Sequence, residues 1–353
     1  MIITHISWLG YHNIGDDLMA EAIRYYFLKR FKDIRYYVWS EGYIKQTESI
    51  QSIYKISPRI KWLKQCQENI CLKKSDILLV GGGSILHSEN SIRWKLRGIK
   101  YIKEKRPTAK ALGINLSIGP FRRDKEQSLC REFVQSLDAA SFRDISSFEF
   151  ACGCNPCYEP ILSSDLAASF LEFSGIKPRV PVKTVRHVGL CLTPVRGYGI
   201  SLVEQYSALV DKMSTMYKSV ILFSFCKHSK YGDYELNVHI AKRIHKKNIH
   251  VIAYDGNINA FLGSMKTCDL FIPVRLHGAI LAYLLKIPFI PISYHQKCES
   301  FLEMIGIQKK QYLDIQQPFA DLIPKNMILN PTFSTEKFLQ MSLLNFKIFD
   351  GII

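Results

Sequence analysis

Long apolar runs are missing from this chain. No stretch approaches the about 18 consecutive uncharged apolar residues that a membrane-spanning helix requires, so no transmembrane helix is expected. The opening residues, MIITHISWLGYHN, carry neither a basic flank nor a long apolar core, so no secretory signal is expected either. These absences favour a cytoplasmic protein, and its ten cysteines are then expected to remain reduced thiols.

Several binding signatures are missing as well. The turn Gly10–Gly15 lacks the Gly-x-Gly-x-x-Gly spacing of a dinucleotide fingerprint. Cys152, Cys154 and Cys157 lie close together without the second spaced pair of a closed zinc site. We therefore interpret them as thiols in a turn and expect no metal, with a zinc or iron–sulfur site as the alternative. The basic residues are scattered and form no recognised nucleic-acid-binding pattern, so no nucleic acid is expected.

Negative charge is scarce. The chain has 47 Lys and Arg against 31 Asp and Glu, a formal net charge of +16. Such a balance implies an acidic partner, of which nucleic acid, an anionic membrane face and a phosphorylated small substrate are the main classes. The charge also fits peripheral contact with the anionic inner face of the cytoplasmic membrane.

The 353 residues exceed the usual size of one domain, and an α/β rhythm starts twice along them. Short apolar strands alternate with helical spacing, which is typical of βαβ units around a parallel sheet. We predict two Rossmann-like domains, 1–170 and 171–330, with parallel sheets facing a central cleft, and a helical tail, 331–353. The predicted strands are Ile2–Trp8, Ile34–Trp39, Asp76–Val80, Lys110–Ile118 and Asp138–Phe142, then Val188–Leu192, Ser219–Phe225, Ile249–Tyr254, Leu270–Val274 and Phe289–Ser293.

The second half carries the clearest candidate site. Arg275 and His277 directly follow the predicted strand Leu270–Val274, His277 opens a helix-like segment, and Lys297 closes the same unit. Ligands of open parallel sheets bind at the carboxyl ends of the strands, and a helix N-terminus there favours anions. Three cationic or titratable side chains at one such place predict an anion site, against the alternative that they are ordinary surface charges.

The first half carries two glycine motifs. In the turn Gly10–Asp17 the glycines allow close backbone approach to a ligand, and Asn13 suits a turn. Asp16 and Asp17 either complement the dipole of the following helix or act on a ligand hydroxyl as acid or base. The second motif, Gly81–Ser84, follows an apolar strand and predicts a ligand-proximal turn, with a tight strand-to-helix connection as the alternative.

Arg143 is the third candidate of the first half. It follows the short strand Asp138–Phe142 and precedes residues that are typical of a helix start. In that position its guanidinium can hold a carboxylate or phosphate bidentately.

Taken in chain order, these motifs resemble the polysaccharide pyruvyl transferase family. The order matches from residue 10 to about residue 306. The Arg-Leu-His block with its trailing Lys is the specific part, whereas glycine turns are shared with many α/β proteins. The matching motifs are Gly10–Asp17, Gly81–Ser84, Ser141–Asp144, Asp165 with Ala167, Arg275–His277 and Tyr294–Lys297.

The resemblance implies an activity and roles for the candidate residues. It implies a glycosyltransferase-B-like enzyme that transfers pyruvate from phosphoenolpyruvate, its co-substrate, to a sugar of a cell-surface polysaccharide or lipid-linked precursor, usually as a ketal. No cofactor is implied. The resemblance implies that Arg143, His277 and Lys297 bind the donor, and Arg275 of the predicted anion site is added to them. The catalytic candidates are His277, Asp16 and Asp17, and the acceptor-binding candidates are Asn13, Gly15, Gly82, Gly83 and Ser84.

The chain also departs from the family pattern. His87 and Ser88 stand where the family often has an Asp, and Asp165-Leu166-Ala167 replaces the usual Asp-Pro-Ala; both departures concern the acceptor side. A nucleotide-sugar glycosyltransferase and a non-catalytic protein that binds anionic ligands stay as alternatives. The sequence leaves open the sugar, its hydroxyl pair, ketal or enol-ether product, and the oligomeric state.

Overall fold

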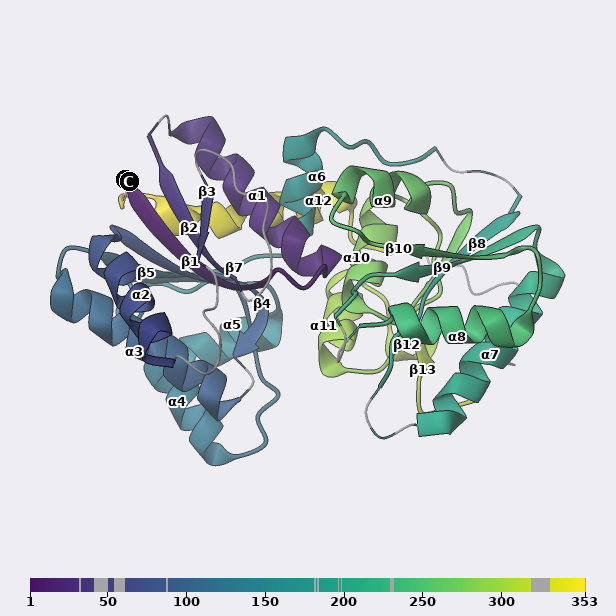
Figure 1. Cartoon of the computed structure of the whole chain (residues 1–353), viewed down its shortest axis with the longest axis horizontal. Helices are drawn as coiled ribbons and strands as arrows, with labels where there is room; N and C mark the ends of the chain where they lie inside the picture. The colour runs from purple at the N-terminus through teal and green to yellow at the C-terminus, as the bar shows by residue number, and fades with distance from the viewer. Residues whose placement is uncertain are drawn as a thin grey trace. The chain divides into compact units, whose positions relative to one another are not determined.

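The structure is a computed structural model that describes residues 1–31, 33–40, 50–53, 61–86, 88–180, 182, 184–195, 197, 199–228, 232–318 and 331–352. The chain divides into two compact units (Figure 1). The first unit consists of residues 1–11, 16–174 and 336–353, and the second of residues 12–15 and 175–335. The C-terminal residues thus return to the unit that the N-terminus begins.

Within its described residues, the first unit contains a seven-stranded parallel sheet in the order β3-β2-β1-β4-β5-β6-β7. Apolar side chains fill the central strands, as in β5, where seven consecutive residues are buried. Such runs are expected of parallel strands that are covered on both faces. The strands are β1 (Ile2–Leu9), β2 (Arg35–Ser40), β3 (Ile50–Ile53), β4 (Ile77–Leu86), β5 (Lys110–Ile118), β6 (Ala139–Phe142) and β7 (Ile161–Leu162).

Helices cover both faces of this sheet (Figure 1). Helices α3 and α4 pack against each other and bury an apolar stripe on β4 and β5, whereas the end of α1 contacts the C-terminal residues through the stacked rings of Tyr26 and Phe346. The helical segments are α1 (Ile14–Arg30), α2 (Lys61–Lys74), α3 (Glu89–Lys105), α4 (Asp124–Ser136), α5 (Ile145–Cys152), α6 (Ala167–Ser174), α12 (Thr335–Leu343) and the 3-10 helix η3 (Leu344–Phe349).

The second unit is a smaller version of the same design, with a four-stranded parallel sheet in the order β10-β9-β8-β11 over its described residues. Helices α7 and α8 cover one face of the sheet, and the Phe261 ring of α9 packs on the other. Its elements are β8 (His187–Cys191), α7 (Gly199–Met216), β9 (Ser219–Ser224), α8 (Tyr234–Ile244), β10 (Ile249–Ala253), α9 (Ile258–Met265), β11 (Leu270–Pro273), α10 (Leu276–Leu284), β12 (Ile292–Ser293), α11 (Gln296–Met304), η2 (Lys309–Gln311) and β13 (Leu313–Asp314).

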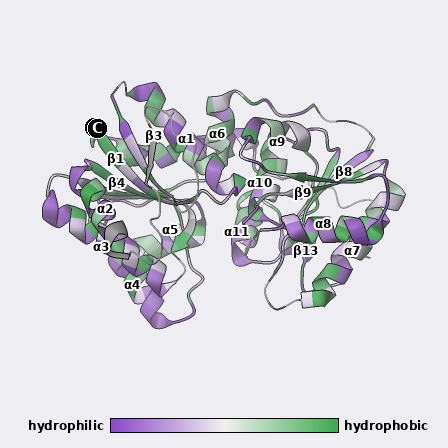
Figure 2. Cartoon of the chain, viewed as in Figure 1, coloured by the Kyte–Doolittle hydropathy of each residue, from purple (hydrophilic) through white to green (hydrophobic). Residues whose placement is uncertain are grey.

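Hydrophobic residues gather on the strands of each unit, and polar residues alternate with them on the covering helices (Figure 2). In α3 the buried positions follow helical spacing, with Ile92, Leu96, Ile99 and Ile102 facing the sheet. The core of each unit therefore lies between its own sheet and its own helices.

Most predicted strands are present within two residues of their predicted ends, and Lys110–Ile118 is reproduced in full. Two predictions are wrong. The motif Gly81–Ser84 is not a turn after a strand, because β4 continues to Leu86 with a register shift after Gly83. The prediction of one continuous strand over Phe289–Ser293 is also wrong: Phe289 forms an isolated parallel bridge with Phe271 of β11, whereas Ile292–Ser293 pairs with β13. Pro288 and Pro291 cannot donate to a ladder, so the pairing is interrupted.

Candidate functional site

The first unit has its topological switch point between β1 and β4. The strand order passes from β1 to β2 and β3 on one side and from β4 to β5 on the other, so the connections that follow β1 and β4 lead to opposite faces. The predicted turn follows β1, and Gly81–Gly83 lie in the carboxyl half of β4. Open parallel sheets bind ligands at this position.

Gly83 brings two predicted site residues together. A Cβ atom placed on Gly83 would lie 3.6 Å from Asp16 Oδ1 and 3.9 Å from Arg143 Nη1. With φ of 115°, Gly83 also has a backbone that disfavours any side chain. The first unit therefore assembles a predicted catalytic carboxylate and a predicted donor-binding cation at one strand end.

Arg143 is buried against a carboxylate. Its Nη1 donates to Asp165 Oδ2 at 3.1 Å, and the two side chains are only 6% and 3% exposed. The second oxygen of Asp165 accepts the backbone N–H of Ala167 at the start of α6. Asp165 thus orients Arg143 and offsets its positive charge. Arg143 would therefore bind an anion mainly through hydrogen bonds from its oriented N–H groups rather than through net charge.

The remaining acceptor-side candidates of the first unit lie near the carboxyl ends of β1 and β4. Asp17 shares the first turn of α1 with Asp16, where carboxylates favour the helix dipole. A Cβ atom on Gly82 would lie 3.1 Å from Ser7 Oγ, so the buried Gly82 leaves room for this hydroxyl. The backbone of Ser84 belongs to β4, and its side chain lies outside the described residues.

The second unit has its switch point between β8 and β11. Arg275 and His277 lie at the carboxyl end of β11 as predicted, with Arg275 at the N-cap of α10 and His277 in its first turn. The helix begins at Leu276, one residue earlier than its predicted start. The first turn of a helix has backbone N–H groups without an intrahelical partner, and this favours a bound anion.

Gly15 and His277 are in direct contact. A Cβ atom on Gly15 would lie 2.0 Å from His277 Nδ1, a distance that no side chain can occupy. The segment that carries Gly15 is held on the end of β9, because Ile14 N donates to Phe225 O at 3.0 Å and Asn13 forms an antiparallel bridge with Cys226. Asn13 Oδ1 also accepts the N–H of Gly15. Gly15 is therefore required by the position of the imidazole.

Arg275 is paired with a residue that the sequence predictions missed. Its Nε donates to Asp233 Oδ2 at 2.5 Å, and Asp233 is fully buried. Burial opposes the charge of Arg275, but the Asp233 carboxylate outweighs it and raises the pKa of the guanidinium above its usual value. Asp233 comes directly before α8, which is a common place for a helix-start Asp, and its pairing with a residue 42 positions away carries no sequence signal.

Lys297 lies in the first turn of α11, which His295 caps by accepting the Lys297 backbone N–H on Nδ1 at 3.3 Å. The ammonium of Lys297 lies 5.8 Å from the ring centroid of Tyr294, within cation–π range. Arg275 and His277 thus lie at the N-cap and in the first turn of α10, after β11, and Lys297 lies in the first turn of α11, after β12.

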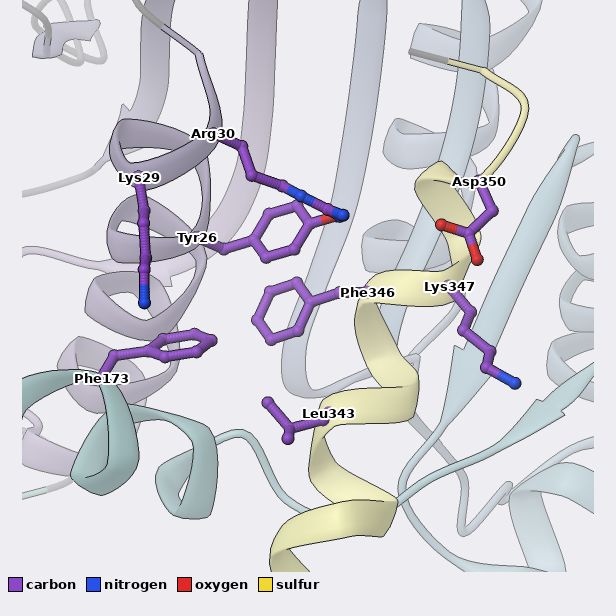
Figure 3. A pocket seen from close by; sticks show the side chains of 8 residues that line it. All are labelled: Tyr26, Lys29, Arg30, Phe173, Leu343, Phe346, Lys347 and Asp350. Carbon is purple, nitrogen blue, oxygen red and sulfur yellow. The ribbon is translucent and has the colours of Figure 1, made fainter.

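A separate cavity of about 450 Å³ lies at the other end of α1, in the first unit (Figure 3). It is lined by Tyr26, Lys29, Arg30, Phe173, Leu343, Phe346, Lys347 and Asp350, and none of these is a predicted site residue. Arg30 bonds the Tyr26 hydroxyl and lies over its ring, as Figure 3 shows. The cavity marks the seam along which the C-terminal residues pack on α1.

Among the described residues, no group of three or more His, Cys, Asp or Glu side chains is arranged to hold a metal ion. Cys152 and Cys157 are exposed thiols, whereas Cys154 is buried and bonds Phe150 O. Burial raises the pKa of the Cys154 thiol. Over the same described residues, no helix has the length and apolar character needed to cross a membrane.

Comparison with known proteins bears on the family and the fold. Residues 13–296 match the model of the family described as polysaccharide pyruvyl transferase. No curated protein sequence matches the chain. Among solved structures, the UDP-GlcNAc 2-epimerase of Neisseria meningitidis bound to UDP-GlcNAc is similar with a TM-score of 0.67 and 10% identity, over 98% of this chain and 99% of that one. The UDP-GlcNAc 2-epimerase of Methanocaldococcus jannaschii has a TM-score of 0.58 and 11% identity, over 98% and 99%. The likeness shows a glycosyltransferase-B-type fold, as predicted.

Proposed function

The chain belongs to the polysaccharide pyruvyl transferase family, and from that premise we propose that it transfers the pyruvyl group of phosphoenolpyruvate to a sugar. The observation that supports phosphoenolpyruvate as the donor is the helix N-terminus with cationic or titratable side chains at the switch point of the second sheet. There Arg275 and His277 occupy the N-cap and first turn of α10. Phosphoenolpyruvate brings both a carboxylate and a phosphate, and such a ligand requires several cations and free N–H groups in one place.

The proposed reaction balances without a further reactant. The methylene carbon of phosphoenolpyruvate takes up a proton and becomes a methyl group. Two sugar hydroxyl oxygens form bonds to the central carbon and lose their protons, while the bond from that carbon to the phosphate oxygen breaks. One released proton leaves on the phosphate, so a pyruvyl ketal and inorganic phosphate result. The step needs a general acid and a general base.

We assign the roles residue by residue. His277 is the proposed acid and a donor ligand, and Arg275, Lys297 and Arg143 are the further donor-binding residues. Asp16 and Asp17 are proposed to take the proton of an acceptor hydroxyl. The position of Asp16 Oδ1, 3.6 Å from where a Cβ atom on Gly83 would lie, supports this role for Asp16. Acceptor binding is assigned to the backbone and side chains of the two glycine motifs, namely Asn13, Gly15, Gly82, Gly83 and Ser84.

For the acceptor we propose a lipid-diphosphate-linked oligosaccharide at the inner face of the cytoplasmic membrane. The support for this assignment is the net charge of +16, since basic proteins gain from anionic lipid surfaces. No cofactor beyond the co-substrate enters the scheme.

Calorimetric titration at low salt tests the donor. Phosphoenolpyruvate is expected to bind saturably, and His277→Ala and Arg143→Ala are each expected to weaken binding by at least about tenfold, as loss of a charged contact does. His187→Ala is a matched control, because His187 begins β8 at the opposite end of the same sheet from His277. Titration with nucleotide sugars is the second arm. If a nucleotide sugar binds and phosphoenolpyruvate shows no binding, this proposal is replaced by the nucleotide-sugar glycosyltransferase alternative.

A further inference from the structure

We propose that Asp233 is a positioning residue of the donor site: it sets the orientation of Arg275 and fixes the strand end on which Gly15 and His277 rest. The inference rests on the proposed function, in which Arg275 and His277 bind phosphoenolpyruvate. Asp233 touches neither the predicted catalytic residues nor an exposed surface, since its side chain is fully buried. Its effect would pass through the groups that it holds.

The first group is Arg275. Asp233 Oδ2 accepts Nε–H at 2.5 Å, which fixes the plane of the guanidinium and leaves the terminal nitrogens to other contacts. The Arg275 side chain keeps 16% of its surface exposed, so a ligand can reach part of it. A guanidinium held at Nε binds an oxyanion with less loss of rotamer freedom than a mobile one.

The second group is the backbone at the end of β9. Asp233 Oδ1 accepts Cys226 N at 3.0 Å, and Oδ2 also accepts Phe225 N at 3.2 Å. The carbonyl of the same Phe225 accepts Ile14 N, and Gly15 follows with His277 against it. One carboxylate therefore joins the two elements that place Arg275 and His277.

An amide at this position would fail on both counts. Asparagine has one acceptor oxygen, and its NH2 group would face a backbone N–H or the guanidinium, which are donors as well. Loss of the negative charge would also leave Arg275 buried without its counter-ion. Asp233→Asn is thus a nearly isosteric change that removes the arrangement.

The same unit contains a matched control. Asp269 also accepts two backbone N–H groups, those of Arg186 at 2.8 Å and His187 at 2.9 Å, and Arg179 Nη2 at 2.9 Å. It precedes β11, at the amino end of the strand whose carboxyl end carries Arg275. Asp269→Asn therefore reports the cost of breaking a comparable buried pair away from the donor site.

The experiment compares the two variants in the full-length protein. Both are expected to lower the temperature of unfolding. Only Asp233→Asn is expected to raise the dissociation constant for phosphoenolpyruvate, by at least about tenfold, with the KM for the acceptor unchanged. Asp233→Glu, which keeps the charge, is expected to restore part of the affinity. Equal weakening in Asp269→Asn, or wild-type affinity in Asp233→Asn, would overturn the proposal.

A second readout does not depend on the donor. The Nε–H proton of Arg275 is expected to exchange slowly with solvent in the wild type and in Asp269→Asn, and rapidly in Asp233→Asn and to a lesser degree in Asp233→Glu, as followed by ¹⁵N NMR. If the wild type does not bind phosphoenolpyruvate, the proposed function fails while this readout still tests the positioning role. Slow exchange that persists in Asp233→Asn would refute that role alone.

Discussion

Gly15 has no side chain, and the ring of His277 occupies the space that one would take. Its backbone lies in the first turn of α1 and is helical, so the glycine is not required by its own dihedral angles. This glycine of the motif is therefore needed because it leaves room for His277, a titratable side chain from a distant segment of the chain.

Gly15→Ala is expected to displace the His277 ring and lower pyruvyl transfer by about 100-fold, the usual effect of moving a catalytic group by about 1 Å. Steady-state kinetics with phosphoenolpyruvate checks this. The fold is expected to survive, because alanine is favoured in a helix by about 1 kcal/mol over glycine.

Gly263→Ala is the control for that variant. Gly263 lies in α9 of the same unit, and a Cβ atom there would meet nothing within 4 Å. This variant is expected to keep wild-type activity. Full activity of Gly15→Ala would show that His277 does not need its present position.

His5 predicts a pH dependence of stability. It is buried on β1, its Nε2 faces Gly81 O at 3.3 Å and its Nδ1 faces the Tyr36 hydroxyl at 2.5 Å. Burial lowers its pKa from 6.5 to about 4. The unfolded chain therefore binds a proton near pH 6.5 that the folded chain refuses until about pH 4, so stability falls as the pH drops through this window, by about 3 kcal/mol.

Urea unfolding at several pH values checks the slope. All four tryptophans, Trp8, Trp39, Trp62 and Trp94, lie in the first half of the chain, so their fluorescence follows that half. His5→Gln is expected to lose this part of the slope between pH 6.5 and 4, while carboxylates keep theirs. An unchanged slope would mean that His5 is protonated in the folded protein.

Among the elements of the first unit, α3 and the C-terminal η3 each place one buried polar side chain in the core, Lys95 and Asn345 respectively. Lys95 lies on the buried face of α3 and donates to Ser91 O and Oγ, and no carboxylate pairs with it among the described residues. Asn345 of η3 packs against the sheet: its Oδ1 accepts from Ser141 and Ser163, and its Nδ2 donates to Ser164 O. The two residues predict opposite outcomes.

Lys95→Met is expected to stabilise the first unit at pH 7. Burial lowers the pKa of Lys95 from 10.5 to about 8, so below pH 8 the folded protein carries a poorly solvated ammonium. Methionine fills a similar volume without that charge, which predicts a gain of about 1 to 3 kcal/mol. The gain should shrink as the pH rises from 8 to 10.5, because Lys95 then loses its proton in the folded state. A constant difference across this range in urea titrations would contradict the explanation.

Asn345→Ala is expected to destabilise the first unit by about 3 kcal/mol, because it leaves buried hydroxyls and a carbonyl without their bonds. Lys347→Ala, an exposed position on the same η3, is the control and is expected to change stability by less than about 0.5 kcal/mol. Tryptophan-detected urea unfolding measures both. Equal stabilities of the two variants would show that the C-terminal residues do not support the sheet.

At the scale of the whole molecule, net charge is the dominant property. A charge of +16 creates a long-range attraction for anionic surfaces that salt screens within about 10 Å at 0.1 M. We expect the protein to sediment with vesicles rich in phosphatidylglycerol at low salt and to be released by added salt. Phosphatidylcholine vesicles are the control. Equal binding to both vesicle types, or binding that salt leaves unchanged, would contradict an electrostatic membrane contact.

The sequence alone predicted most of the strands and the location of the motifs, but not the strand conformation of Gly81–Ser84. Strand ends, glycine turns and the Arg-Leu-His block depend on residues close together in the chain, because strand periodicity, turn conformations and helix starts are local. In each parallel sheet the carboxyl ends of all strands lie at the same end of the sheet. The positions of Arg275, His277 and Asp16 at strand ends therefore follow from the sequence. Family motifs added the chemistry, which composition does not contain.

Only the tertiary structure decided which side chains meet. Asp233 with Arg275, Gly15 with His277 and Asn345 with Ser141 join residues 42 to more than 200 positions apart. Each contact follows from how a whole sheet and its helices pack, and no spacing along the chain records it. The continuation of β4 through its glycines was hidden for the same reason: neighbouring strands supply the hydrogen bonds that hold residues of low strand propensity in place.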